Sequence, residues 1–118
     1  MQVPCEAQYV ESIKNMAVTS ARQFGAPENM LTPIASSVDE VFSLFIHPNS
    51  HNNNMSILIV TDEHKCDIGF VSYSSTALNI NDNDARLTTI KAYMDSVEIV
   101  KLPTRGNLLK MSKNFTTV

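Results

Sequence analysis

Cysteine is scarce in this sequence, and neither cysteine nor histidine is arranged as in a cross-linked or metal-binding protein. Only Cys5 and Cys66 occur, far apart in the chain. A disulfide framework requires more cysteines, and a structural zinc site requires them in local pairs. No cysteine or carboxylate completes a ligand set with the three histidines, which are His47, His51 and His64. We therefore expect two reduced thiols and no metal site.

Clustered positive charge and long apolar runs are also lacking. Lysines and arginines are scattered and the net charge is −3, which argues against nucleic acid as the main partner. The first residues, MQVPCEAQ, lack the basic start and apolar run of a secretion signal. The longest apolar runs are far shorter than a membrane span. We therefore expect a cytoplasmic protein that binds neither nucleic acid nor membrane.

The sequence does contain enough apolar residues to build a core. They make up 43% of 118 residues, which is typical of a folded chain of one domain. We therefore predict a single domain over residues 1–118. The initial Met and the full domain length favour a standalone chain over a piece of a larger signalling protein.

Residues 6–24 have the periodicity of an amphipathic helix. Gly25 is a natural residue for the position after the helix, and Pro27 prevents its continuation. The apolar stripe consists of Tyr9, Val10, Ile13, Met16, Ala17 and Phe24.

A second helix is predicted after the connector 26–32, which has room for one helical turn. Thr32 is placed to cap this helix and Pro33 to occupy its first position. The helix is expected to run to about His47, where Pro48 stops it. The polar residues that follow indicate a loop.

The rest of the chain alternates hairpins with one helix. Two β-rich runs joined by DEHK form the first hairpin, and two more around PTRG form the second. MQVP is a candidate edge strand. These elements predict an α+β two-layer sandwich, in which a mostly antiparallel sheet carries three helices on one face. In order they are strands 55–61 and 66–74, loop 75–85, helix 86–94, and strands 97–102 and 107–112.

The first of these strands is apolar on both of its alternating sides. Met55, Ile57 and Ile59 share one side, and Leu58 and Val60 share the other. Helices of a two-layer sandwich cover only one face of the sheet, so the second set needs cover from elsewhere. We expect either a contact with a protein partner or a second copy, or simply an exposed apolar face.

Four strings occur in the same order as in one known family: ARQFGAPENMLTPIASSVDEVF, MSILIVTDEHKCDIGFVSYS, IKAYMDSVEIV and RGNLLKMSKNF. Over nearly the whole chain they resemble the histidine-kinase-like (GHKL, Bergerat-fold) ATPase domain, in its branch of anti-sigma-factor serine kinases. The most specific part is the join from Met94 to Val97, at the family's distance before Gly106. The resemblance implies a Bergerat fold, an ATP site, and a partner that is a sigma-like protein or a STAS-domain anti-anti-sigma protein.

The resemblance also assigns roles on the second helix. In this family a helix carboxylate activates the attacking group, and an Asn one turn later binds Mg²⁺ through oxygen. Glu40 matches the carboxylate, but Leu44 stands at the Asn position. A shift of one residue would place Asp39 at the acid, Ser43 at the Asn and His47 at the following His. Neither register supplies the Asn.

The adenine and phosphate positions of the family are altered as well. Tyr73 replaces the Asp that accepts from adenine, and Ser75 replaces the first Gly. Asp84 and Arg86 stand in the lid, where glycines let backbone N–H groups wrap the phosphates. Asn107 replaces a Thr. Losing the adenine acceptor and a metal ligand costs roughly 2–4 kcal/mol each, and about 1.4 kcal/mol is tenfold in affinity. The vestigial site positions are therefore Glu40, Ser43, Leu44, Tyr73, Ser75, Asp84, Arg86 and Asn107.

The sequence therefore predicts a non-catalytic regulatory module that binds protein and needs neither cofactor nor metal. The alternative is an active ATP-dependent serine protein kinase with an unusual Mg-ATP site. Glu40 would then be the base, and the missing magnesium ligand would come from Asn79, Asn81, Asn83 or Asn107.

Overall fold

The computed structural model describes residues 2–4, 7–45, 54–72, 84–101 and 107–115. Within these ranges the chain forms five strands, three α-helices and one 3-10 turn. In chain order they are β1 (Gln2–Pro4), η1 (Ala7–Tyr9), α1 (Val10–Gln23), α2 (Glu28–Phe45), β2 (Asn54–Thr61), β3 (Lys65–Ser72), α3 (Ala85–Tyr93), β4 (Ser96–Lys101) and β5 (Asn107–Asn114).

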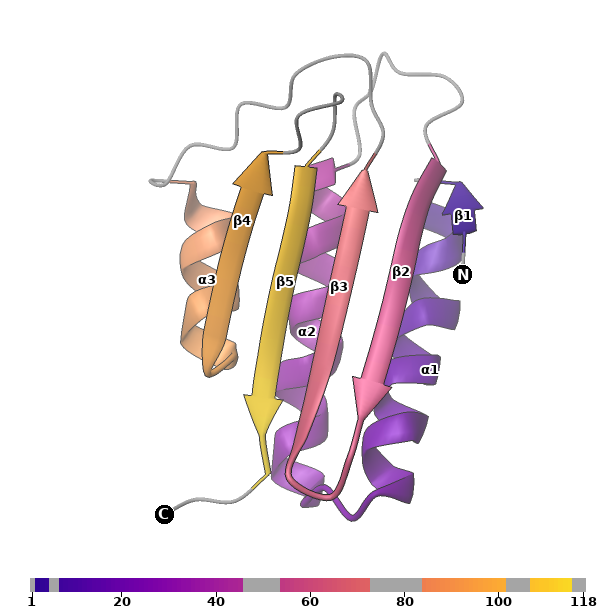
Figure 1. Cartoon of the computed structure of the whole chain (residues 1–118), viewed down its shortest axis with the longest axis vertical. Helices are drawn as coiled ribbons and strands as arrows, with labels where there is room; N and C mark the ends of the chain where they lie inside the picture. Colours follow the sequence, from indigo (N-terminus) through magenta and orange to yellow (C-terminus); the bar gives the residue numbers. More distant parts are fainter. Residues whose placement is uncertain (1, 5–6, 46–53, 73–83, 102–106, 116–118) are drawn as a thin grey trace.

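The strands form one sheet in the order β1-β2-β3-β5-β4, and every neighbouring pair is antiparallel. Figure 1 shows all three helices on the same side of this sheet. Among the described residues no helix lies on the other side, which we call the open face. The predicted α+β two-layer architecture is confirmed, and so is the edge strand at the N-terminus.

The first helix ends in a Schellman motif, as the glycine after it predicts. Gly25 adopts a φ of 89°, a left-handed conformation that glycine tolerates without a steric penalty. Its N–H donates to the Arg22 carbonyl at 3.1 Å, and the Ala26 N–H donates to the Ala21 carbonyl at 3.0 Å. These two bonds satisfy carbonyls that the helix end would otherwise leave unpaired.

The predicted apolar stripe of this helix is only partly correct. Ile13, Ala17 and Ala21 are buried, whereas Met16 and Phe24 are exposed. The buried positions recur every four residues, so the covered stripe is narrow and two of its members are small. Phe24 lies at the C-cap, outside the helical repeat.

The predicted start of the second helix is wrong. α2 begins at Glu28, and Pro33 lies inside it instead of at its first position. The Met30 N–H donates to the Pro27 carbonyl at 2.9 Å, which closes an earlier first turn. Pro33 removes a bond to the carbonyl of Asn29, but Asn29 is exposed, so water can satisfy that group. The extra turn buries Leu31, and this burial stabilises the longer helix.

The core lies between the helices and the covered face of the sheet. The rings of Phe42 on α2 and Phe70 on β3 meet edge to face, with centroids 6.4 Å apart and planes at 88°. Ile57 of β2 is the register partner of Phe70. Alternation along β3 buries Cys66, Ile68, Phe70 and Ser72.

The buried thiol of Cys66 belongs to a short chain of hydrogen bonds. The Ser20 hydroxyl on α1 donates to Thr61 Oγ1 at 2.8 Å. The Thr61 hydroxyl in turn donates to Cys66 Sγ at 3.5 Å. Burial raises the pKa of Cys66, so the thiol stays protonated and poorly reactive at neutral pH. Cys66 is unbridged, as expected, and Cys5 lies outside the described residues.

Candidate functional site

Several chain segments meet at the end of the molecule that is uppermost in Figure 1: α2 and β3 end there, and β5 begins there. α3 starts toward the same end and packs beside α2. This topology brings Glu40, Ser43 and Leu44 of α2 toward Asp84 and Arg86 at the start of α3. The structure therefore places together five of the positions that the family resemblance assigns to an ATP site.

Arg86 joins the start of α3 to the end of α2. Asp84 is the N-cap of α3 and accepts the Arg86 N–H at 2.9 Å. The same carboxylate accepts Arg86 Nε at 3.0 Å and Arg86 Nη2 at 2.8 Å. Arg86 Nη1 donates to the backbone carbonyl of Ser43 at 2.7 Å. We call this set of three residues, Asp84, Arg86 and Ser43, the Arg86 bridge.

In the Arg86 bridge, the Asp84 carboxylate and the Arg86 guanidinium stabilise each other's charged form. Hydrogen bonds from the Arg86 side chain and backbone lower the pKa of Asp84 to about 2. The carboxylate raises the pKa of Arg86 in return, and Glu40 adds to this through space. Asp84 is therefore ionised at neutral pH, and its negative charge lies at the start of α3.

Asp39 and Glu40, the two residues that the resemblance offers as the acid, meet different neighbours of α2. Asp39 pairs with Lys14 of α1, at 2.9 Å between Asp39 Oδ2 and Lys14 Nζ. Glu40 instead contributes, through space, to raising the pKa of Arg86 on α3. Asp39 thus belongs to the ion pairs between α1 and α2, and Glu40 lies on the side of α2 that meets α3.

The two positions that the resemblance gives to the metal ligand, Ser43 and Leu44, offer only one side-chain oxygen, the Ser43 hydroxyl. Leu44, which stands at the magnesium-ligand position, is only 4% exposed and packs in the core. Ser43 is exposed, and its carbonyl is already taken by Arg86. An apolar side chain and an occupied carbonyl are poor partners for a hard cation.

Asn107 is buried at the start of β5, opposite Ser72 of β3 in the sheet register. It therefore lies at the same end of the sheet as the α2 and α3 positions. Tyr73 and Ser75, which the resemblance places at adenine, lie outside the described residues. So do the other candidate ligands and two histidines, namely Asn79, Asn81, Asn83, His47 and His51.

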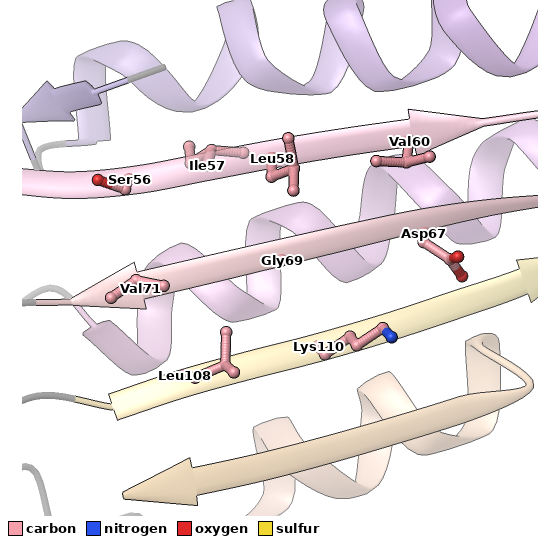
Figure 2. Close-up of a pocket in the computed structure, with 9 residues that line it drawn as sticks. All are labelled: Ser56, Ile57, Leu58, Val60, Asp67, Gly69, Val71, Leu108 and Lys110. Atoms are coloured by element: carbon pink, nitrogen blue, oxygen red, sulfur yellow. The ribbon is translucent and has the colours of Figure 1, made fainter. Parts of the chain in front are cut away.

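The open face forms a second candidate surface, and its centre is apolar. Leu58 is 66% exposed and Val60 is 52% exposed. With Val71 of β3 and Leu108 of β5 they line a groove of about 460 Å³. Figure 2 shows these side chains across three strands, with Gly69 between them. The full lining is Ser56, Ile57, Leu58, Val60, Asp67, Gly69, Val71, Leu108 and Lys110.

Sequence reasoning identified only the β2 side of this groove. Leu58 and Val60 were recognisable because they alternate with the buried residues of their strand. The same alternation in CDIGFVS and NLLKMS would have found Val71 and Leu108. Gly69 could be placed at the centre only once the register was known, because it lies opposite Leu58 and Lys110 on the two neighbouring strands.

A third candidate surface is a hollow of about 390 Å³ between α1 and α2. Its charged side chains are largely paired with one another. Lys14 bridges Glu11 and Asp39, and Arg22 Nε lies 3.5 Å from Glu28 Oε1. This hollow is therefore a solvent-exposed groove between two helices, lined by charges that already pair with one another.

The described part of the chain has neither a metal-binding cluster nor a membrane-spanning helix. No group of three or more His, Cys, Asp or Glu residues there is placed to hold a metal ion. His64 is exposed beside Glu63. None of the described helices is both long enough and apolar enough to cross a membrane.

No family model matches the chain, and no curated protein matches its sequence.

Proposed function

We propose that this chain is a non-catalytic regulatory module of the anti-sigma-factor type, built on a Bergerat-like fold whose nucleotide site is degenerate. Its partner would be a sigma-like protein or a STAS-domain anti-anti-sigma protein in the cytoplasm. The fold order, with helices on one face of an antiparallel sheet, supports the resemblance on which this proposal rests.

The observation that carries the proposal is the Arg86 bridge. A phosphate-binding lid needs free donors, but the Arg86 guanidinium donates to Asp84 and to the Ser43 carbonyl. A triphosphate would meet the ionised Asp84 carboxylate and would have to displace an existing ion pair. Leu44 supports the same conclusion, because it fills the magnesium-ligand position with a buried apolar group.

The open face supports the protein-binding half of the proposal. A contiguous apolar surface that the described residues leave uncovered is typical of a protein contact. It spans three neighbouring strands and is bordered by polar side chains such as Lys110 and Ser56, as protein interfaces usually are.

The nucleotide half is tested by calorimetry with Mg-ATP on the wild type and on Leu44→Asn. We expect no saturable binding up to about 1 mM for either protein, because the Arg86 bridge remains in both. A dissociation constant below about 100 μM, or roughly −5.5 kcal/mol, would overturn the proposal. A gain of about tenfold (1.4 kcal/mol) from Leu44→Asn alone would show that the rest of the pocket is intact.

The regulatory half is tested with purified STAS-domain and sigma-like proteins from the same organism. We expect binding that is equal with and without Mg-ATP, and equal for wild type and Glu40→Ala. The alternative function, a working serine protein kinase, has one feature in its favour, because Glu40 lies on the candidate-site side of α2. ATP-dependent labelling of a STAS partner that Glu40→Ala abolishes would establish that alternative.

A further inference from the structure

The groove on the open face has a glycine at its centre, in the interior of β3. Gly69 pairs with both neighbouring strands. A Cβ atom built there would meet nothing within 4 Å, and the backbone is not left-handed. Among the described residues, neither packing nor backbone conformation therefore requires a glycine. Glycine weakens a strand interior, and it often marks a place where a ligand approaches the backbone closely.

Side chains surround this bare stretch of backbone. Leu58 on β2 and Lys110 on β5 are the register partners of Gly69. Asp67 and Val71 precede and follow it on the same side of β3, because side chains alternate along a strand. Figure 2 shows these side chains around Gly69. We call the space that they enclose the Gly69 hollow.

The dimensions of the Gly69 hollow match a flat ring system. Usual strand spacing and rise give about 10 Å from Leu58 to Lys110 and about 13 Å from Asp67 to Val71. The floor therefore has an area of roughly 130 Å². Such a floor covers one face of a bicyclic aromatic group, whose complete burial removes about 250 Å² from water.

The groove as a whole has the size and lining of a small-molecule site. Its volume is about 460 Å³. Sites for small molecules usually have about 300–1,000 Å³, with a mostly apolar lining and a few polar groups that orient the ligand. The apolar side chains on the open face here are Leu58, Val60, Val71 and Leu108, and the polar ones are Ser56, Asp67 and Lys110.

The charges around the groove are already balanced. Asp67 accepts a hydrogen bond from the Ser112 hydroxyl, and its Oδ2 lies 3.4 Å from Lys65 Nζ. Lys110 lies directly opposite Glu98 of β4 in the sheet register, where side chains of antiparallel strands interact. An ionic ligand would meet a like charge next to each opposite one. The groove therefore favours an uncharged molecule.

Two polar groups of the groove favour an aromatic ligand with a hydrogen-bond donor. A carboxylate has about four lone-pair sites, and the contacts of Asp67 with Ser112 and Lys65 leave some of them for a ligand N–H. Lys110 is exposed beside the same floor. A lysine ammonium is attracted to the face of an aromatic ring, and it has no such attraction to a saturated one.

We propose that the open-face groove binds an uncharged, flat heteroaromatic molecule that carries an N–H donor. Its rings lie on the backbone of Gly69, between Leu58 and Lys110, and its N–H donates to the Asp67 carboxylate. The site goes beyond the proposed function and does not rest on it, because it uses none of the nucleotide positions and no protein partner. A bound ligand would compete with protein contact at this part of the face.

The test is an NMR titration of the isotope-labelled full chain with indole, which is the probe for this class. We expect a dissociation constant below about 2 mM. The shifted backbone amides should centre on Gly69 and its register partners on β2 and β5. A dissociation constant above about 2 mM, or shifts centred on another surface, would overturn the proposal.

Two leucine variants test whether the ligand occupies the Gly69 hollow. Gly69→Leu should raise the dissociation constant of indole at least about tenfold, because the new side chain fills the hollow. Ser96→Leu places the same side chain on β4 at an exposed position outside the groove, and should leave the constant within about twofold. Equal effects of the two variants would contradict the assignment. Thermal melts confirm that both variants are folded.

Analogues of the probe test the donor and the absence of charge. N-methylindole should bind the wild type at least about fivefold more weakly than indole, because it cannot donate to Asp67. In Asp67→Ala the difference between the two probes should fall below about twofold. Tryptamine and an indole carboxylate should both bind more weakly than indole. If either charged probe binds as tightly as indole, or if methylation has no effect on the wild type, the proposed ligand class is wrong.

A second copy of the chain is the competing occupant of this face. Amide shifts around Gly69 that follow protein concentration and do not respond to indole would assign the face to self-association and overturn the ligand site. None of these results bears on the nucleotide test. Tight Mg-ATP binding would in turn overturn the proposed function and leave the ligand site in place.

Discussion

The two faces of this sheet are built from the same strands, yet they have opposite surroundings. On β2 and β3 the residues Ile57 and Phe70 point to the helices and are buried, whereas Leu58 and Val60 point away and are more than half exposed. Both sets are apolar, so composition alone does not separate them. The difference shows which apolar residues the chain uses for its own folding and which remain available for contact with another molecule.

The largest expected effect compares one residue from each face. Phe70→Ala should destabilise the monomer by about 3–5 kcal/mol, because it leaves a cavity beside Phe42. Leu58→Ala should change the free energy of unfolding of the monomer by less than about 0.5 kcal/mol. Urea denaturation of both variants measures the difference. Similar losses for the two variants would mean that the open face also stabilises the monomer.

A smaller effect is expected inside the covered layer. Ser37 is fully buried on α2, and among the described residues its Oγ has no hydrogen-bond partner. Ser37→Ala removes this unpaired hydroxyl and raises helix propensity, so we expect a gain of about 1 kcal/mol. The urea midpoint should therefore rise while the slope of the transition stays constant. A loss of stability would show that the hydroxyl is satisfied, and that the covered face tolerates buried polar groups.

The smallest effect concerns the Arg86 bridge, which joins the end of α2 to the start of α3. The pKa of Asp84 is lowered to about 2, so its ionised form stabilises the fold above its ordinary pKa near 4. This contribution is lost as the pH falls through about 2. Asp84→Asn keeps a capping side chain but loses the charge, so it should melt below the wild type at neutral pH.

Melting curves of both proteins between pH 7 and pH 2 test this dependence. The difference in melting temperature should be constant down to about pH 4 and should shrink toward pH 2. The effect is modest because the Arg86 and Asp84 side chains are partly exposed. A difference that stays constant throughout would show that the Arg86 bridge contributes no charge-dependent stability.

Much of the fold was predictable because the relevant signals are local. The alternation of Met55, Ile57 and Leu58 predicts a strand with two distinct sides, and Gly25 predicts the end of the first helix. The start of α2 was not predictable from its capping residues, because burial of Leu31 outweighed the bond that Pro33 removes. Packing energy from residues distant in sequence overrode a local preference.

The arrangement of the candidate-site residues was not predictable from the sequence. The resemblance named Asp84, Arg86 and Ser43 separately. These residues form one bridge because α3 packs against α2. Arg86 and Ser43 are separated by 43 positions in the sequence. Helix packing decides in the same way that Asp39 meets Lys14 of α1 while Glu40 lies toward Arg86 of α3.

The sequence by itself determined the elements, their order and the two-sided character of the central strands, because periodicity and backbone preference are properties of neighbouring residues. Only the tertiary structure decided that β5 lies beside β3, that Arg86 reaches the end of α2, and that Leu58 stands next to Gly69. These are through-space relations, set by strand register and helix packing, and no local pattern encodes them.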